Sequence, residues 1–503
     1  MIPDAWVSAV RSLVAATAFF CLEAKALPVQ ESTELEVFED PAPPKVLEID
    51  LGAAADAADN EEVTFRAPPR PLSADAITED WPHFLGPRFN CTSSETRLLK
   101  DWSKEGPAIV WEMRRGQSYS SPVFVGDRLV YFHRIGDEEV VECLEAGTGK
   151  RFWRHGSPTT YRDAFGYNNG PRASPVIDGD FVYVLGAQGV LRCIHLGSGA
   201  LCWRRELMKE FSISQDFFGI ASTPLLWKDF VVVNLGAPGG PCAAAFDKHS
   251  GKMVWGAGRQ WGASCASPIP AMLGGRERLL LFAGGKSRPP VGGLLCLDPA
   301  SGRVDFEFPW RSKSFESVNA ATPVVIGDTV FISASYDTGS ALLKVLPEGG
   351  QELVWTSKDI GLHFNTPVFI DGHFYGPDGR NEPDTTLACW DASTGEVKWR
   401  TTLEWEETFE RGGKSITRAI PAARCSLLLA DGACLCLGEM GHLLWLDLSP
   451  QGCEETARCW LFAAGETWTP PIVHKGLLYI CQNARDLLGR SEPRLLCYDL
   501  RGQ

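Results

Sequence analysis

The chain has 503 residues, 44% of them hydrophobic and 22% charged, and its formal net charge at pH 7 is −15. This length allows a large folded core, and the acidic balance lacks the clustered lysine and arginine that nucleic-acid binding requires. Beyond the N-terminus, no apolar run is long enough to cross a membrane as a helix.

The N-terminal residues have the pattern of a signal peptide. Arg11 precedes an apolar run over 12–22, and Ala24-Lys25-Ala26 supplies the small residues of a cleavage site. Asp4 and Glu23 fit such a segment poorly, so a short buried helix is the alternative. We expect residues 1–26 to be a signal peptide and the protein to be exported to the bacterial periplasm.

The next segment, 27–79, is acidic and rich in proline and alanine. Over 27–80, fourteen acidic residues stand against three basic ones, so this segment carries most of the net charge and leaves the rest of the chain near neutral. A segment with few apolar residues and many like charges buries too little apolar surface to offset the conformational entropy lost on folding. This composition predicts a disordered, self-repelling spacer.

From Asp80 onward, one unit is repeated eight times. It consists of Ser/Thr-Pro, an apolar strand, Gly-Asp, a second strand, then Asp-x-x-Ser/Thr-Gly and a tryptophan, and its clearest copy runs from Thr366 to Trp399. The copies are 44 to 55 residues apart, a spacing typical of propeller blades. The prolines that open them are Pro122, Pro175, Pro224, Pro268, Pro323, Pro367, Pro421 and Pro470.

The first copy shows what one unit builds. Four strands are predicted, over 123–125, 129–133, 140–144 and 151–154, and Gly126-Asp127 forms a tight turn between the first two. Such a sheet cannot bury both faces alone, so the copies must stack around an axis.

The fourth strands carry the recurrent tryptophan. Its copies are Trp153, Trp203, Trp255, Trp355, Trp399 and Trp460, whereas the fourth repeat has Phe306-Glu307-Phe308. The eighth copy ends at 496–500 without a fourth strand, and residues 109–113 match the missing pattern. Pairing them would leave no open edge. The predicted fold is therefore all-β, an eight-bladed β-propeller of four-stranded blades over 80–503, its last blade closed by an N-terminal strand.

The sixteen cysteines do not form an obvious disulfide framework. Five occupy one repeat position in five different blades, too far apart to be bridged, and are predicted to be small core residues: Cys143, Cys193, Cys296, Cys389 and Cys497. The pairs Cys453/Cys459 and Cys425/Cys434 are left open as local bridges. The spacing of Cys434 and Cys436 does not suit zinc, and no metal site is predicted.

The residues that depart from the repeat gather in two kinds of connection. One joins the fourth strand of a blade to the first strand of the next, the other joins the second strand to the third, and both emerge on one face of a propeller. They mix aromatic side chains with Arg, Asn and Asp, which suits a ligand or peptide surface. We choose nine as the candidate binding face: Tyr161, Arg172, Phe217, Phe218, Asn319, Tyr336, Asp378, Arg380 and Trp468. The alternative for each is a purely structural role between blades.

Two motifs carry a family resemblance. Residues 387–399 (LACWDASTGEVKW) resemble the tryptophan-docking repeat of quinoprotein dehydrogenases, which use pyrroloquinoline quinone (PQQ), and of their non-enzymatic relatives. Residues 80–87 (DWPHFLGP) resemble the opening of PQQ-like propeller proteins of planctomycete-type bacteria. Stretches 169–175, 317–323 and 468–471 match as well, so the resemblance covers about residues 80–500.

The resemblance implies a propeller fold and is compatible with two functions, a quinone-dependent dehydrogenase and a cofactor-free binding protein. Quinoprotein alcohol dehydrogenases place a disulfide of adjacent cysteines against the quinone and hold calcium with acidic and amide residues, but this sequence has no adjacent cysteines and no matching ligand set. The BamB-like branch uses the same repeats without a cofactor and binds partners through one face.

We therefore expect an exported, monomeric, non-catalytic propeller that binds a protein or a small molecule at one face. In this interpretation no cofactor is needed; the aromatic candidates supply contact area and the charged or amide ones supply orientation. One alternative is a PQQ-dependent oxidoreductase in which Arg172, Asn319, Asp378 and Arg380 hold the cofactor or calcium in an altered arrangement. Another is a carbohydrate-active propeller with paired carboxylates, such as Asp378 with Glu466 or Asp337.

Overall fold

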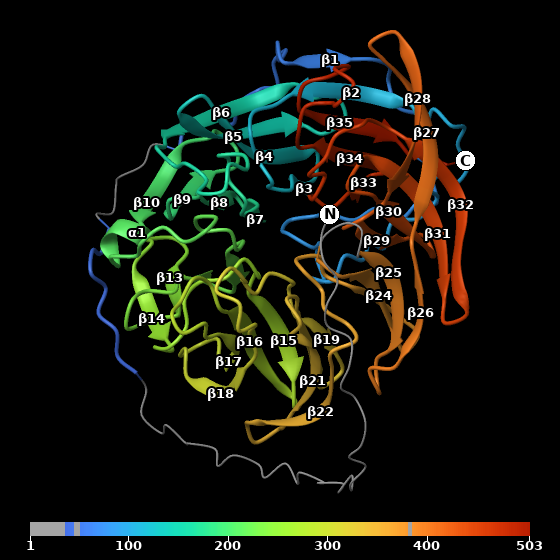
Figure 1. Ribbon diagram of the computed structural model, residues 1–503. Helices are drawn as coiled ribbons and strands as arrows, with labels where there is room; N and C mark the ends of the chain where they lie inside the picture. Colours follow the sequence, from blue (N-terminus) through green and yellow to red (C-terminus); the bar gives the residue numbers. More distant parts are fainter. Residues whose placement is uncertain (1–35, 45–50, 381–384, 503) are drawn as a thin grey trace, which may run out of the picture. The chain divides into compact units, whose positions relative to one another are not determined.

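The computed structural model describes residues 36–44, 51–380 and 385–502, which belong to one compact unit, Glu34–Gln503. The predicted signal peptide lies outside the described residues. Within these ranges the chain folds into eight blades around an axis, together with one separate hairpin (Figure 1). The single helix assigned there, α1 (Leu207–Glu210), has four residues. In this part of the chain no helix has the length and apolar character needed to cross a membrane.

Each blade is an antiparallel sheet whose strands follow one another along the chain. Blade 1 comprises β3 (Val123–Val125), β4 (Arg128–Ile135), β5 (Glu138–Glu145) and β6 (Arg151–Pro158). Blade 2 comprises β7 (Val176–Asp178), β8 (Phe181–Leu185), β9 (Val190–His195) and β10 (Leu201–Glu206). Blade 3 comprises β11 (Leu225–Trp227), β12 (Phe230–Asn234), β13 (Ala243–Asp247) and β14 (Met253–Ala257). Blade 4 comprises β15 (Ile269–Leu273), β16 (Arg276–Ala283), β17 (Gly293–Leu297) and β18 (Val304–Pro309).

The second half of the ring follows the same plan. Blade 5 comprises β19 (Val324–Ile326), β20 (Thr329–Ala334), β21 (Gly339–Val345) and β22 (Gln351–Ser357). Blade 6 comprises β23 (Val368–Ile370), β24 (His373–Asp378), β25 (Thr386–Asp391) and β26 (Val397–Thr401). Blade 7 comprises β29 (Ser426–Ala430), β30 (Ala433–Leu437), β31 (His442–Ser449) and β32 (Gly452–Trp460). Blade 8 contains β33 (Ile472–His474), β34 (Leu477–Gln482) and β35 (Arg494–Asp499).

The last blade is completed from the other end of the sequence, as predicted. Strand β2 (Ile109–Arg114) pairs antiparallel with β35, so the first strand-forming part of the repeat region closes the ring. A further strand, β1 (Val63–Phe65), adds to the outer edge of β2 and makes this the one five-stranded sheet among the residues the structure covers. The predicted fold class is thus confirmed, with one extra strand.

In six of the eight blades a tryptophan joins the blade to the next one. The indole Nε1 of Trp153 donates a hydrogen bond of 2.7 Å to the carbonyl of Leu196, which lies at the turn between the third and fourth strands of blade 2. Gly199 of the same turn has φ +76°, and a Cβ there would lie 2.7 Å from the Trp153 ring. Five other indoles make the equivalent bond, at distances of 2.8–3.1 Å: those of Trp111, Trp203, Trp255, Trp355 and Trp399.

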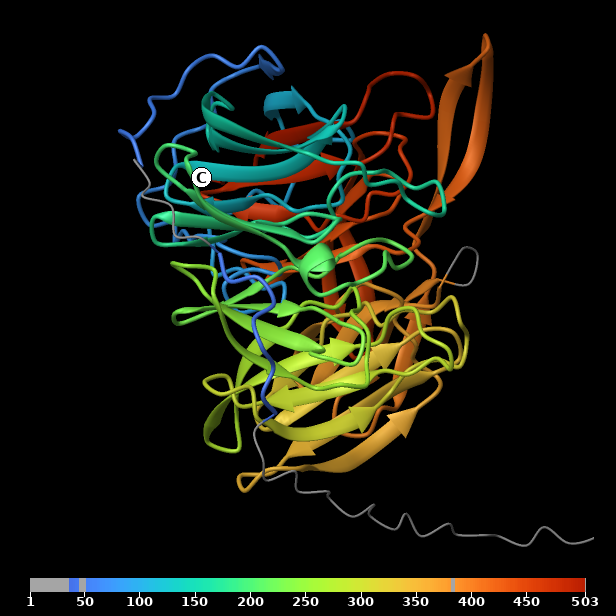
Figure 2. The ribbon, with the colours of Figure 1, turned by 90° about the vertical axis from the view of Figure 1, so that its left-hand side faces the viewer.

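Two details of the predicted repeat are wrong, and both concern blade 7. Pro421 does not open that blade, because it ends an inserted hairpin of β27 (Glu404–Arg411) and β28 (Lys414–Pro421), which projects from the body in Figure 2. Trp460 does not join blades either. It lies at the end of β32 and its indole donates to the Met440 carbonyl of its own blade, while Ala457 occupies the docking position, opposite Trp445 and beside the bulge.

The predicted spacer is partly ordered. Among its described residues, Asp40 pairs with Arg205 of blade 2, whose side chain is 0% exposed, and β1 pairs with β2 of blade 8. Ala58 forms a β-bridge with Arg151 of blade 1. We call residues 36–44 and 51–66 the belt, because they follow the outer edges of the blades. The acidic composition predicted disorder, but a buried guanidinium and unpaired strand edges give this segment partners.

Residues 79–93, which we call the plug, lie across the inner strands of the blades. Backbone bonds join Trp81 to Phe124 of β3, and Ser93 donates to the Leu429 carbonyl of β29. Between these points the ring of His83 stacks on that of Phe89 at 3.9 Å. In Figure 1 this segment, in blue, lies at the centre of the ring. The plug therefore fills one end of the central channel.

All fifteen cysteines within the described ranges are free. The five at the shared repeat position are buried, as predicted for small core residues. The two local bridges that the sequence left open are absent among these residues, and no group of three metal-binding side chains occurs there.

Candidate ligand pocket on the propeller axis

A cavity of about 220 Å³ lies on the axis, between the plug and the connections that link successive blades. All eight of those connections contribute to its wall, and Phe84, Leu85 and Cys91 of the plug also line it. Residues distant in sequence are thus brought to one place because each blade delivers one loop to the axis.

One position of the repeat recurs around the wall. In six blades, the residue three places before the Ser/Thr-Pro proline lines the cavity: Tyr119, Arg172, Ala221, Cys265, Ala320 and Phe364. The proline starts the innermost strand, so this position always faces the axis. Unlike the rest of the motif, its identity changes from blade to blade, which is the pattern expected of a recognition position built on a constant scaffold.

Aromatic rings form one side of the wall. Trp468 is at its centre: Tyr119 stacks on it with ring centroids 5.1 Å apart, Phe364 lies at 5.4 Å, and Tyr167 meets it edge-on at 5.7 Å. The Trp468 indole donates a hydrogen bond of 2.7 Å to Glu439 Oε1, which fixes its orientation.

Two arginines line the cavity, and each is already paired. Arg172 Nη2 lies 2.6 Å from Asp163 Oδ2, and these side chains are 10% and 0% exposed. Arg424 Nε donates to Glu439 Oε2 at 2.9 Å, and its guanidinium lies 5.0 Å from the centre of the Trp468 ring. Because the partner carboxylates lie behind the wall, the cavity presents the arginines without an uncompensated positive charge.

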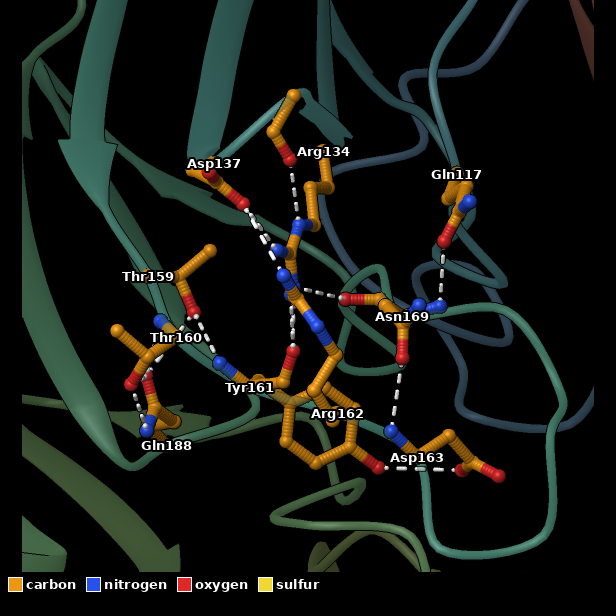
Figure 3. A network of polar contacts seen from close by, with 11 residues as sticks. Gln117, Arg134, Asp137, Thr159, Thr160, Tyr161, Arg162, Asp163, Asn169 and Gln188 are labelled. Atoms are coloured by element: carbon orange, nitrogen blue, oxygen red, sulfur yellow. Dashed lines mark hydrogen bonds and ion pairs between the residues drawn. The ribbon is translucent and has the colours of Figure 1, made fainter.

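The loop between β6 and β7 orients Asp163, the partner of Arg172, and Figure 3 shows the polar contacts of this loop. Asn169 Oδ1 accepts a hydrogen bond of 2.8 Å from the backbone of Asp163, and the Tyr161 hydroxyl donates to Asp163 Oδ2 at 3.2 Å. Arg134 donates to the Tyr161 carbonyl at 2.6 Å. These bonds orient the carboxylate that Arg172 needs.

Two more polar groups complete the site. The hydroxyl of Tyr119 donates a short hydrogen bond to Glu466, and burial together with this carboxylate raises the pKa of Tyr119. His363 lines the cavity, and burial lowers its pKa to about 4, so its ring is neutral at neutral pH. Its Nδ1 is buried and has no hydrogen-bond partner in the described part of the chain. His363 therefore contributes a neutral imidazole ring to the wall.

The structure separates the nine predicted residues into three groups. Arg172, Phe218 and Trp468 line the cavity. Tyr161 and Phe217 are buried behind it, at 1% and 6% exposure. The others lie apart from the lining: Arg380 sits 3.9 Å over the Tyr336 ring, Asn319 bonds to the carbonyls of Ala283 and Trp310, and Asp378 is bound by Gly361 and Arg400. Their role in binding stays a prediction.

Sequence reasoning missed Tyr119, His363, Phe364, Arg424 and the plug residues. The first and third could have been found, because they occupy the same repeat position as Arg172. Arg424 was hidden by the inserted hairpin, which displaces the repeat in blade 7. The plug gave no signal, since it lies outside the repeat and reaches the axis only through tertiary packing.

Comparisons with known proteins agree with this architecture. A family model described as outer membrane protein assembly factor BamB matches residues 136–401. A search of curated proteins gave no match.

Three solved structures are similar over most of the chain. A europium-containing methanol dehydrogenase superposes with a TM-score of 0.60 at 11% identity, covering 84% of this chain and 98% of its own. The quinohemoprotein alcohol dehydrogenase of Comamonas testosteroni gives 0.56 at 12% identity, with coverages of 86% and 82%. BamB of Moraxella catarrhalis gives 0.51 at 15% identity, with coverages of 79% and 99%. At such low identity these likenesses concern the fold alone.

Proposed function

The chain belongs to the family of the outer membrane protein assembly factor BamB, a family of PQQ-like repeat propellers, and we propose that it is an exported, non-catalytic binding or scaffolding propeller. The observation that supports this most directly is the axial cavity. Its wall is aromatic and apolar, its arginines are neutralised, and it opens among the loops that vary between blades. Such a cavity suits binding, because it combines contact area with a few fixed polar groups.

The wall also indicates the class of ligand. Tyr119, Phe364 and Trp468 favour a flat or aromatic group, and the paired arginines offer little to a free anion. His363 adds a neutral imidazole ring to the same wall. We propose a neutral, mainly aromatic ligand, either a small molecule or an aromatic side chain of a protein partner.

The residues present do not fit PQQ with calcium. Among the described residues no aspartate or glutamate lines the cavity, and no group of three side chains there would hold a metal ion. A trianionic quinone would also need uncompensated cations, whereas both arginines are already paired with carboxylates. The fold is thus compatible with a quinoprotein dehydrogenase, but the residues that line the cavity do not support one. Asp378, named for a carbohydrate-active site, is bound to Gly361 and Arg400 instead of standing free.

Isothermal titration calorimetry with N-acetyl-tryptophanamide, a neutral aromatic probe, tests the proposal. We expect saturable binding that weakens at least tenfold in Trp468→Ala and stays within twofold in the control Trp227→Ala, because Trp227 lies outside the cavity. Equal affinity in both variants would contradict the assignment of the cavity.

The dehydrogenase alternative has its own measurement. Thermal unfolding is followed with PQQ and calcium, since a ligand at 100 times its dissociation constant stabilises a fold by about 2.7 kcal/mol. We expect no shift. A saturable shift that is lost in Arg424→Gln would overturn the non-catalytic assignment and favour the oxidoreductase.

Export rests on the N-terminal pattern, and N-terminal sequencing of the protein recovered from a bacterial periplasm tests it. We expect the mature chain to begin at residue 27, and to sediment as a monomer. Recovery only in the cytoplasm with an intact N-terminus would refute export.

A further inference from the structure

A second cavity, of about 530 Å³, opens between blades 8 and 1 on the same face as the axial cavity. We call it the seam groove. Its walls come from the connection between β2 and β3 (residues 115–117), the turn between β4 and β5 (135–137), the loop that contains Arg162 and Asn169, and Pro493. Nothing in the proposed function uses this groove.

The lining of the seam groove is positively charged, in a protein whose net charge is −15. It contains the three arginines Arg115, Arg134 and Arg162, and a single acidic residue, Asp137.

Arg115 contributes a buried charge without a carboxylate beside it. It is 6% exposed, and its guanidinium donates to neutral acceptors only: the carbonyls of Gln482 and Ser118, the Tyr131 hydroxyl and Asn483 Oδ1. Burial lowers its pKa, and no carboxylate opposes that effect. These four bonds engage most of its N–H groups but pair its charge with no carboxylate, which keeps the local potential positive.

Arg134 and Arg162 share the one acid of the groove (Figure 3). Arg134 Nη2 lies 3.0 Å from Asp137 Oδ1, and Arg162 Nη2 lies 3.4 Å from the same oxygen. Arg134 is buried and also donates to the backbone of the β6–β7 loop. The side chain of Arg162 is 63% exposed and has further N–H groups that face solvent. One carboxylate thus serves two cations, and Arg162 is the one able to reach an incoming group.

We propose that the seam groove binds an acidic segment of a protein partner, through carboxylate side chains that complement Arg115, Arg134 and Arg162. An open groove of this volume is larger than one phosphate requires. Each of the two buried arginines already makes four hydrogen bonds within the protein, so they act mainly through charge rather than through direct bonds. A diffuse positive groove with one free guanidinium suits several flexible carboxylates, whereas a phosphate site needs convergent free donors.

The test is calorimetric titration with an acetylated, amidated hexaglutamate peptide at low and at physiological salt, with hexalysine as the charge-reversed peptide. We expect hexaglutamate to bind, more weakly at the higher salt, and hexalysine not to bind. Arg162→Gln should weaken binding about threefold, and Asp137→Asn should strengthen it about threefold, since each changes one exposed charge.

Matched controls change the same charges elsewhere. Arg204→Gln alters an arginine of β10, and Asp229→Asn alters an exposed aspartate at the turn between β11 and β12. Both should leave the peptide affinity within 1.5-fold, roughly the scatter of exposed pairs. Equal effects in the controls, or no binding of hexaglutamate, would overturn the proposal. Inorganic phosphate that binds more tightly than the peptide, with the same dependence on Arg162, would replace it with a simple anion site.

This inference stands apart from the proposed function. Trp468→Ala should abolish binding of the neutral aromatic probe and leave hexaglutamate binding unchanged, so failure of one site is seen separately from failure of the other. Far-ultraviolet circular dichroism and urea midpoints confirm that Arg162→Gln and Asp137→Asn remain folded.

Discussion

Substitution of Gly199 by alanine tests how the blades are joined. The residue has φ +76°, and a Cβ would lie 2.7 Å from the ring of Trp153 in the preceding blade. The left-handed backbone costs a non-glycine residue about 1–2 kcal/mol, and forcing an atom against a packed ring costs about 1–3 kcal/mol more. We therefore expect Gly199→Ala to lower the free energy of unfolding by about 2–5 kcal/mol.

Gly179 supplies the control, because it lies in the same blade with φ +54° and nothing within 4 Å of an added Cβ. Gly179→Ala should cost only the backbone part, about 1–2 kcal/mol. Urea unfolding followed by far-ultraviolet circular dichroism measures both. In a Trp153→Leu background the Gly199 substitution should cost no more than the Gly179 one. If the two alanine variants are equally stable in the wild-type background, the glycine is required for the turn alone, and docking against the ring plays no part.

Two other substitutions test the belt and the plug. Asp40→Asn removes one of the two carboxylates that neutralise the buried guanidinium of Arg205, so it should destabilise the fold by about 1–3 kcal/mol and speed hydrogen exchange over 36–44. The control Glu36→Gln, at an exposed pair, should change stability by under about 1 kcal/mol. Equal effects of the two substitutions would mean that Asp40 does not hold the belt against blade 2. Burial lowers the pKa of His83 to about 4, from an ordinary value near 6.5, so below about pH 6.5 the unfolded chain binds a proton that the folded one does not, and stability falls as the pH falls toward 4. His83→Phe should flatten this slope by up to about 1.4 kcal/mol per pH unit, measured as the difference between the two stability curves, and unchanged slopes would show that the ring is accessible to protons.

The fold could be predicted because the same short sequence motif recurs from blade to blade. Ser/Thr-Pro begins an inner strand, Gly-Asp turns the chain, and the Asp-x-x-Ser/Thr-Gly turn receives the indole of the preceding blade. Local rules therefore agree with the global structure in most of the blades. They failed in blade 7, where the hairpin β27–β28 interrupts the period and a chance proline, Pro421, imitates a start.

The candidate site was predicted only in part, for a different reason. The loops between strands predicted a binding face and the types of residue on it. Which side chains line the cavity depends largely on one repeat position, three residues before the proline. A choice of loops by their departure from the repeat does not identify that position. Asn319 was chosen because it departs from the repeat, but its side-chain amide donates hydrogen bonds to the carbonyls of Ala283 and Trp310. Polarity in a loop often satisfies backbone groups rather than a ligand.

The pairing of β2 with β35 has a consequence for biosynthesis. A ribosome makes residues 109–114 well before residues 494–499, so β2 must wait, without β35, while seven complete blades are translated. The contact of the plug with blade 8, between the His474 ring and the Glu79 carbonyl, is delayed in the same way. Ring closure is thus a late event of very high contact order, and until β35 is made the protein exposes the edge of β2 that β35 later covers.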